Sequence, residues 1–210
     1  MSEASHAAHF ESATQQTQAA RLGMWVFLGS ELLLFAGLLA LYAGARLHSP
    51  VAFRAGIQHA SKLIGSLNTA ILLLSSTAVA AAVELLRRGR RNACIYTLLL
   101  TIGLGGAFLA LKFTEYAGHF SEGIYPGGAG SFFLEHRSPG LAAFWTLYFF
   151  TTGLHAVHVS VGLLVLGITA RRVSKGTLHA THLYALENAA LYWHLIDLIW
   201  IFLWPMYYLA

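Results

Sequence analysis

The stretch ALYWHLIDLIWIFLWPMYYLA, residues 190–210, is long and apolar enough to cross a membrane as a helix. It nevertheless carries His194 and Asp197 in its first half. Ionisable side chains are costly in hydrocarbon, so we expect both to face other helices or a hydrated cavity rather than lipid. The stretch therefore predicts a spanning helix that packs, through these two polar side chains, inside a larger bundle.

The composition of the whole chain supports a membrane protein. Hydrophobic residues make up 57% of the 210 residues and charged residues 10%, whereas soluble domains carry about 25% charged residues. The net charge of +4 is explained by Lys and Arg kept on the cytoplasmic side of a membrane, so nucleic-acid binding is not expected. Cys94 is the only cysteine, which excludes an intrachain disulfide and a thiolate metal cluster.

Hydrophobic segments between charged residues predict an all-α, polytopic membrane protein with a bundle of five transmembrane helices. The predicted helices are residues 22–45, 63–86, 93–111, 141–170 and 189–209. Together they form one membrane domain, residues 21–210, after a polar N-terminal tail, residues 1–20, which lacks the basic start of a signal peptide. The longest connection, residues 112–140, contains EGIYPGGAGSFFLEHRSPG, and its Gly and Pro residues predict an outer loop or short re-entrant segment.

Lys and Arg residues predict the orientation of the bundle. Eight lie on the side of the N-terminus: Arg21, Arg87, Arg88, Arg90, Arg91, Arg171, Arg172 and Lys175. Five lie on the opposite side: Arg46, Arg54, Lys62, Lys112 and Arg137. We therefore expect a cytoplasmic N-terminus and a C-terminus outside.

Small residues recur at helical spacing, which fits a compact bundle rather than isolated spanning helices. Ala78 and Ala82 form one such pair, and Gly106 and Ala110 form another. Helices in lipid pack closely through such residues.

Ionisable residues on three predicted helices fall at similar depths. Glu31 lies about 14 Å, Asp197 about 12 Å and His158 about 18 Å from the inner ends of their helices, at 1.5 Å per residue. His194 is slightly shallower than Asp197, and His155 lies farther from the inner face than His158. Two interpretations remain open, a hydrogen-bonded network that joins the helices and a proton-handling site.

The 11 histidines raise the alternatives of bound haem or iron. His155 or His158 with His194 would supply one haem ligand pair, but no other intramembrane histidine remains for a second. Adjacent His-His pairs, which membrane di-iron enzymes use, do not occur. A small transporter using Glu31 and Asp197 is a further alternative, although the two halves show no inverted repeat.

Five segments, in order along the chain, resemble subunit III of the haem-copper terminal oxidases, the cytochrome c oxidase subunit 3 family. They are RLGMWVFLGSELLLFAGLLALY, SLNTAILLLSSTAVAAAVE, LALKFTEYAGHFSEGIYPG, FFTTGLHAVHVSVGLLVLG and YWHLIDLIWIFLWPMYY. The resemblance covers nearly the whole chain from Arg21 onward. It implies a non-catalytic core subunit with no metal and no haem or copper of its own, because these belong to partner subunits.

The resemblance also implies roles for particular residues. Glu31 matches the intramembrane glutamate of the family, Glu115 the acid of its E-Y motif, and Arg171 and Arg172 a basic position near a lipid headgroup. Another set matches its helix histidines and closing-helix pair: His155, His158, His194 and Asp197. We expect His194 and Asp197 to join a polar cluster with Glu31 or His158. Plain positive-inside anchoring remains an alternative for the arginine pair.

As implied by the resemblance, the partners are the catalytic subunit I, subunit II, membrane phospholipid and, through other subunits, cytochrome c or quinol. The expected location is a bacterial plasma membrane, and the expected role is to support proton uptake and the stability of the catalytic subunit. Longer members of the family have two further helices at the start, which form one wall of a lipid cleft. The segment SFFLEHRSPGLAAFW, residues 131–145, also looks longer than in the common pattern, which leaves a quinol oxidase or a nitric oxide reductase-associated relative as alternatives.

Overall fold

The structure, a computed structural model, describes residues 13–135, 138–178 and 183–209. Within these ranges the chain is almost entirely helical and forms no strand. The elements are α1 (Ala13–His48), α2 (Pro50–His59), α3 (Lys62–Arg87), α4 (Arg91–Ser121), η1 (Pro126–Gly128), α5 (Ser131–Glu135), α6 (Pro139–Ser174), α7 (Tyr184–Trp204) and the π-helical turn η2 (Pro205–Leu209).

Five segments are long and apolar enough to cross a membrane, as the sequence predicts: Gln18–His48, Lys62–Arg87, Arg91–Gly128, Pro139–Ser174 and Tyr184–Leu209. Large apolar side chains are exposed along them, for example Leu33, Leu99 and Leu164. Such an outer surface suits lipid rather than water. The predicted all-α bundle of five spanning helices is therefore confirmed.

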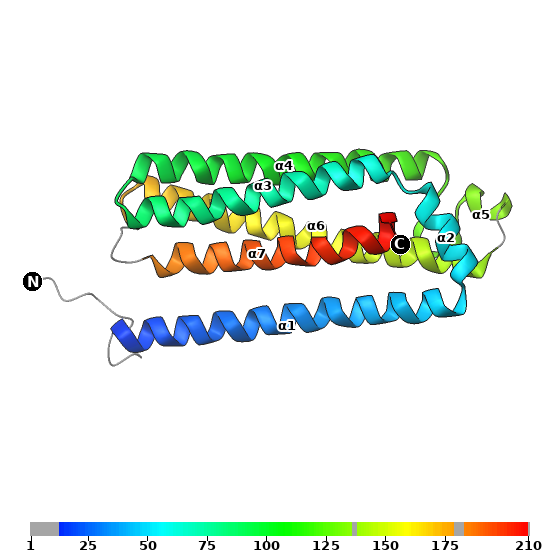
Figure 1. The fold of residues 1–210 in the computed structure, drawn as a ribbon, viewed down its shortest axis with the longest axis horizontal. Coiled ribbons are helices and arrows are strands. Elements are labelled where there is room, and N and C mark those ends of the chain that lie inside the picture. Colours follow the sequence, from blue (N-terminus) through cyan, green and yellow to red (C-terminus); the bar gives the residue numbers. More distant parts are fainter. Residues whose placement is uncertain (1–12, 136–137, 179–182, 210) are drawn as a thin grey trace, which may run out of the picture.

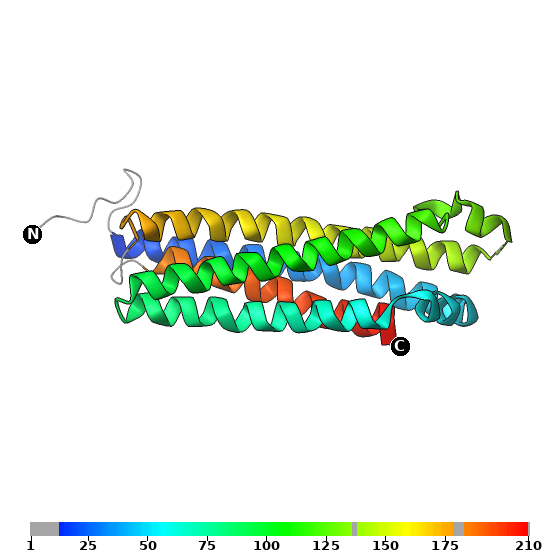
Figure 2. The same ribbon diagram turned by 90° about the horizontal axis from the view of Figure 1, so that it is seen from above.

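The five long helices lie side by side along one axis (Figures 1 and 2). α2, η1 and α5 gather at one end of the bundle, which we call the cap end. The start of α1, the turn between α3 and α4, and the end of α6 lie at the opposite end, which we call the basic end because it carries Arg87–Arg91, Arg171 and Arg172.

α7 is the most enclosed of the five spanning segments. In its most apolar stretch of 18 residues 50% of the residues are buried, against 17% in the corresponding stretch of α1. The indole of Trp193 donates a hydrogen bond to Ser75 Oγ and that of Trp200 to Thr69 Oγ1, both over 3.0 Å, and these bonds join α7 to α3. A Cβ atom at Gly105 on α4 or Gly162 on α6 would lie 2.7–2.8 Å from the Trp193 ring. Glycine at these two positions therefore makes room for the indole.

α1 contacts the rest of the bundle through a narrow stripe. Its buried residues are Leu28, Phe35, Leu38 and Tyr42, and this spacing of seven, three and four residues describes one helical face. The stripe packs on α6 and α7. The Tyr42 hydroxyl donates a hydrogen bond to the carbonyl of Met206 in η2. Most of the remaining α1 surface is exposed.

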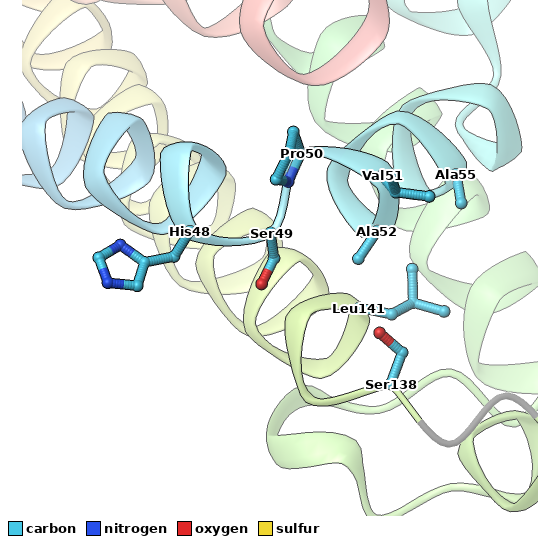
Figure 3. A pocket seen from close by; sticks show the side chains of 8 residues that line it. All are labelled: His48, Ser49, Pro50, Val51, Ala52, Ala55, Ser138 and Leu141. Carbon is cyan, nitrogen blue, oxygen red and sulfur yellow. The ribbon is translucent and has the colours of Figure 1, made fainter.

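At the cap end the chain turns from α1 into α2 against the start of α6. A Cβ at Gly140 would lie 2.5 Å from Ser49 Cβ, so glycine permits this close approach. A cavity of about 550 Å³ lies beside the contact (Figure 3). It is lined by His48, Ser49, Pro50, Val51, Ala52, Ala55, Ser138 and Leu141.

Helix ends differ from the sequence-based expectation in informative places. α1 begins at Ala13, so residues 13–20 of the predicted tail belong to the helix, and residues 1–12 lie outside the described residues. α4 continues to Ser121 rather than ending before Lys112. Lys112 and Glu115, expected in the outer connection, are thus buried within a helix. The helix continues because the lysine finds a carboxylate and two hydroxyl partners inside the bundle.

Candidate functional site

Glu31 on α1 and His158 on α6 form a hydrogen-bonded pair between the two helices. Glu31 Oε2 lies 2.8 Å from His158 Nε2, and the two side chains are 17% and 14% exposed. His158 Nδ1 lies 2.8 Å from the carbonyl oxygen of Leu154. The Phe35 ring packs against the imidazole with 5.3 Å between ring centroids. The structure thus joins two of the predicted site residues.

The hydrogen bonds of His158 restrict where protons can lie in this pair. A carbonyl oxygen only accepts, so Nδ1 must be the donor to Leu154. His158 Nε2 then either donates to an ionised Glu31 or accepts from a protonated one. The pair can therefore hold one proton between the two residues at either position, which is the chemistry that a proton-handling group needs.

His194 and Asp197 on α7 face α3 rather than Glu31. His194 Nδ1 lies 2.7 Å from Ser76 Oγ, and Ser76 also lies beside the Asp197 carboxyl group. Asp197 is 3% exposed, and among the described residues neither of its carboxyl oxygens has a partner in hydrogen-bond geometry. The single cluster expected from depth is therefore divided into two sites. One lies between α1 and α6 at Glu31 and His158, and the other lies between α3 and α7 at His194 and Asp197.

A groove connects the second of these sites with the basic end. It has a volume of about 430 Å³ and is bordered by residues of α1, α3 and α7, including Arg21, Glu187 and His194. Glu187 pairs with Arg87 at 3.2 Å and with Arg21 at 3.6 Å. Charged groups at the basic end are thus linked by open space to an imidazole inside the bundle.

His155 lies in neither site. It is fully buried, with its ring 5.1 Å from Trp200 and 5.6 Å from Phe108 between centroids. Neither ring nitrogen has a hydrogen-bond partner within the described ranges, and both atoms of the Asn68 side-chain amide share this condition. Buried polar atoms of this kind are commonly satisfied by internal water.

A third polar site surrounds Lys112 in the cap half of the bundle. Lys112 Nζ donates three hydrogen bonds: to Glu115 Oε2 at 3.0 Å, to the Tyr148 hydroxyl at 3.0 Å and to the Tyr208 hydroxyl at 2.9 Å. The Tyr208 hydroxyl donates in turn to Glu115 Oε1 at 2.9 Å. Lys112 and Glu115 side chains are each 2% exposed.

Aromatic rings complete the surroundings of the Lys112 ammonium group. Nζ lies 4.8 Å from the centroid of the Tyr148 ring and 4.9 Å from that of Tyr116. The faces of such rings attract a cation, most strongly where water is excluded. All three ammonium donors are satisfied, so this site is a closed and neutral structural cluster.

The haem alternative receives little support from these positions. His158 uses both ring nitrogens in hydrogen bonds, and His194 is engaged through Nδ1 with Ser76. The His155 ring contacts Phe108 edge-on and lies tilted against Trp200. Each imidazole thus serves a different helix contact instead of turning toward a common ligand.

Arg171 and Arg172 lie in the last turn of α6 at the basic end, and both are exposed. Within the part of the chain that the structure describes, neither takes part in an ion pair. His179 and His182, which repeat the spacing of the intramembrane histidine pair, lie outside the described residues.

Sequence reasoning missed several residues of these sites. The missed partners are the hydroxyl groups of Ser76, Tyr148 and Tyr208. The chain has many Ser and Tyr residues, and the sequence alone does not indicate which of them meet an ionisable group. For Lys112 a signal existed, because Lys112 and Glu115 stand three residues apart and share a helical face. The charge of Lys112 instead predicts the end of the helix at residue 111.

The fold and these sites define a polytopic helical membrane protein that carries ionisable groups paired between its helices. Across residues 1–210 the sequence matches the family described as cytochrome c oxidase subunit III. The chain belongs to this family.

The chain is similar to proteins named as subunit 3 of two kinds of oxidase. The chain is 26% identical to "Probable quinol oxidase subunit 3" of Staphylococcus haemolyticus, over 95% of this chain and 92% of the relative. It is 29% identical to "Quinol oxidase subunit 3" of Bacillus spizizenii, over 90% and 85%. It is 32% identical to "Cytochrome c oxidase subunit 3" of Damaliscus lunatus, over 95% and 72%.

Proposed function

We propose that the chain is a cofactor-free core subunit III of a respiratory terminal oxidase, a complex that reduces oxygen and translocates protons. The match of all five spanning segments to one family, over the whole chain, carries this proposal. The intramembrane histidines support it, because each is engaged in a helix contact of its own. Haem and copper then belong to subunits I and II, which are the partners of this chain.

The electron donor defines two versions of the proposal. The relatives include proteins named as subunit 3 of quinol oxidases and of cytochrome c oxidases. Of the three relatives compared above, the two that the chain covers over more of their length carry the quinol oxidase name. We therefore place the quinol oxidase first and cytochrome c oxidase second, with the donor bound by other subunits in both cases.

The proposed orientation puts the basic end in the cytoplasm of a bacterium and the cap end outside the plasma membrane. The arginine residues of the basic end support this orientation, since Lys and Arg are retained on the cytoplasmic side. The groove that leads from Glu187 to His194 then opens toward the cytoplasm. We propose that His194, Ser76 and Asp197 form a route for protons taken up from that side, and that Glu31 and His158 hold a proton farther along.

Arg171 and Arg172 are proposed to bind the headgroup of an anionic phospholipid. Both are exposed at the end of α6, where basic residues close to the bilayer attract anionic lipid by about 1 kcal/mol each. Retained lipid in the purified assembly tests this role, with Arg171→Ala/Arg172→Ala compared with Arg90→Ala/Lys175→Ala. The second pair removes the same charge from the same end, so equal lipid loss from both variants would leave only plain anchoring.

Purification through a tag on this chain in mild detergent tests the main proposal. We expect larger partner subunits to co-purify and a reduced-minus-oxidised haem spectrum that stays with those subunits when this chain is removed. Oxygen consumption with quinol, but not with reduced cytochrome c, selects the first version. Haem or iron that remains with the separated chain would refute the proposal.

Asp197→Asn tests the proton route within the assembled complex. Asn retains the shape of the side chain but cannot release a proton, so we expect slower proton uptake and earlier loss of activity during turnover. Glu135→Gln, an exposed position at the cap end, is the matched control. Unchanged assembly, lipid content and proton uptake in the Asp197 variant would remove this site from the proposal.

A further inference from the structure

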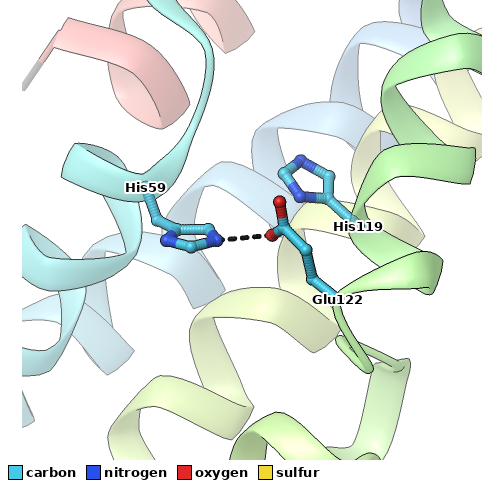
Figure 4. Close-up of side chains that lie close together, drawn as sticks. All are labelled: His59, His119 and Glu122. Carbon is cyan, nitrogen blue, oxygen red and sulfur yellow. Dashed lines mark hydrogen bonds and ion pairs between the residues drawn. The ribbon is translucent and has the colours of Figure 1, made fainter.

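Three metal-ligating side chains meet at the cap end, outside the polar sites already described. They are His59 at the end of α2, His119 in the last turn of α4 and Glu122 directly after α4 (Figure 4). One ligand atom from each lies within 4.8 Å of the other two. His119 and Glu122 are three residues apart on one helical face, and α2 brings His59 to the same place.

Aromatic residues set the positions of the two imidazoles. The Trp145 ring lies 4.7 Å from the His119 ring and 5.9 Å from the His59 ring, between centroids. The Phe132 ring lies 5.4 Å from that of His59. Ligands whose rings are held by packing lose little freedom on binding an ion, which favours a defined site.

His119 is almost fully buried, and one of its two ring nitrogens faces a carboxylate. The residue is 6% exposed, and its Nε2 atom has no hydrogen-bond partner among the described residues. The same nitrogen lies 3.9 Å from Glu115 Oε1, so Nδ1 is the ring nitrogen that remains to bind an ion. A metal-bound histidine commonly directs its other ring N–H at a carboxylate, which fixes its tautomer and strengthens its basicity, and Glu115 is placed to serve in this way.

The carboxylate of Glu122 is available for an ion. Glu115 is already neutralised by Lys112, whereas in the part of the chain that the structure describes Glu122 is paired with His59 alone, at 2.7 Å. Glu122 and His59 side chains are 53% and 39% exposed. Both can therefore turn toward an ion, which would take the place of the hydrogen bond between them.

We propose that His59, His119 and Glu122 bind one divalent transition-metal ion, with Zn²⁺ as the best fit. Two imidazole nitrogens and one carboxylate oxygen leave the fourth tetrahedral position to water, and this ligand set suits Zn²⁺. Ca²⁺ and Mg²⁺ prefer oxygen ligands and are disfavoured by the histidines. Neighbouring ligand atoms around Zn²⁺ are about 3.3 Å apart, whereas here they lie within 4.8 Å of one another. The side chains therefore have to move closer together to bind the ion.

The bound ion would join α2 to the end of α4. α2 otherwise packs mainly against α6 and η2. The ion would therefore add a link between α2 and α4 at the cap end of the bundle. This site lies beyond the expectation from sequence, which placed no metal in the chain.

The test compares zinc bound by three forms of the assembly that carries this chain. Each is stripped with chelator, equilibrated with ZnCl₂ and excess Mg²⁺, passed through gel filtration, and analysed for metal per chain. We expect the unmodified protein to retain one Zn²⁺ more than His59→Ala/Glu122→Gln, while His48→Ala/Glu135→Gln retains as much as the unmodified protein. The control residues are likewise an exposed histidine and an exposed glutamate at the cap end.

Equal zinc in the unmodified protein and the His59→Ala/Glu122→Gln variant would overturn the proposal. Should that variant fail to assemble, X-ray absorption at the zinc edge of the unmodified protein decides. Two imidazoles at 2.0–2.1 Å from the ion, visible by their multiple scattering, support the site, and a shell of water or thiolate alone overturns it. Assembly and oxidase activity need not change in either case, so the outcome is separate from that of the proposed function.

Discussion

The Lys112 site and the Glu31–His158 pair are both ionisable groups inside the same bundle, but they are built in opposite ways. Lys112 and Glu115 stand on one helix and are each 2% exposed, and the three donors of the ammonium group are satisfied by the Glu115 carboxylate and by two hydroxyl groups of α6 and η2. Glu31 and His158 stand on two helices and are 17% and 14% exposed. The closed site holds its ammonium group in one fixed arrangement, whereas the more open pair has two possible positions for one proton.

Lys112→Met should have the largest effect on stability, because it leaves the Glu115 carboxylate buried without its cation. Breaking a buried pair in this way costs about 3–5 kcal/mol. We expect a large fall in the thermal unfolding temperature of the purified assembly, or loss of assembly.

Lys112→Met/Glu115→Gln is the companion variant. It removes both charges and keeps a polar group near Tyr208, so we expect it to regain much of the lost stability. If the double variant is as unstable as the single one, charge pairing is not what holds the closed site together.

Gly105→Leu should have the next largest effect on stability, and it tests helix packing rather than charge pairing. Its first side-chain atom would lie 2.7 Å from Trp193, and overpacking of this kind costs about 1–3 kcal/mol. Gly106→Leu is the matched control, because no atom lies within 4 Å of a Cβ there. The unfolding temperatures of the two variants should differ clearly, and equal values would contradict the close contact between Gly105 and the Trp193 ring.

The Glu31–His158 pair should give the smallest energetic effect. Interhelical hydrogen bonds in membranes contribute about 0.6 kcal/mol and at most about 1.7. A double-mutant cycle with Glu31→Ala and His158→Ala measures the coupling, and infrared spectra of Glu31→Gln should lose a carboxyl band that responds to turnover. A coupling larger than that between Lys112 and Glu115 would reverse the comparison between the two regions.

The sequence predicted the five spanning helices because their apolar length and bounding charges depend on local residues alone. It also predicted that Glu31, His158, His194 and Asp197 are intramembrane polar groups. Which of them meet could not be predicted, because depth along a helix says nothing about rotation around its axis. His194 and Asp197 therefore turned out to face Ser76, not Glu31.

Other differences have equally local causes. The predicted helix 93–111 ends ten residues before the observed end of α4 at Ser121. A single sequence does not reveal that two tyrosines from α6 and η2 accept hydrogen bonds from the Lys112 ammonium group. Of the two small-residue pairs, Ala78 and Ala82 are buried. Gly106 and Ala110 are exposed, and α4 contacts the Trp193 ring one residue earlier, at Gly105.

The central place of α7 has a consequence for how the protein is made. The other four spanning segments precede α7 in the chain, yet they pack around it, and Trp193 occupies the space that Gly105 and Gly162 leave for it. During synthesis those four helices enter the membrane first and have to wait, with an open seam, until α7 emerges from the ribosome. The bundle therefore closes only after α7 has been translated, and a chain cut short before α7 leaves this seam open.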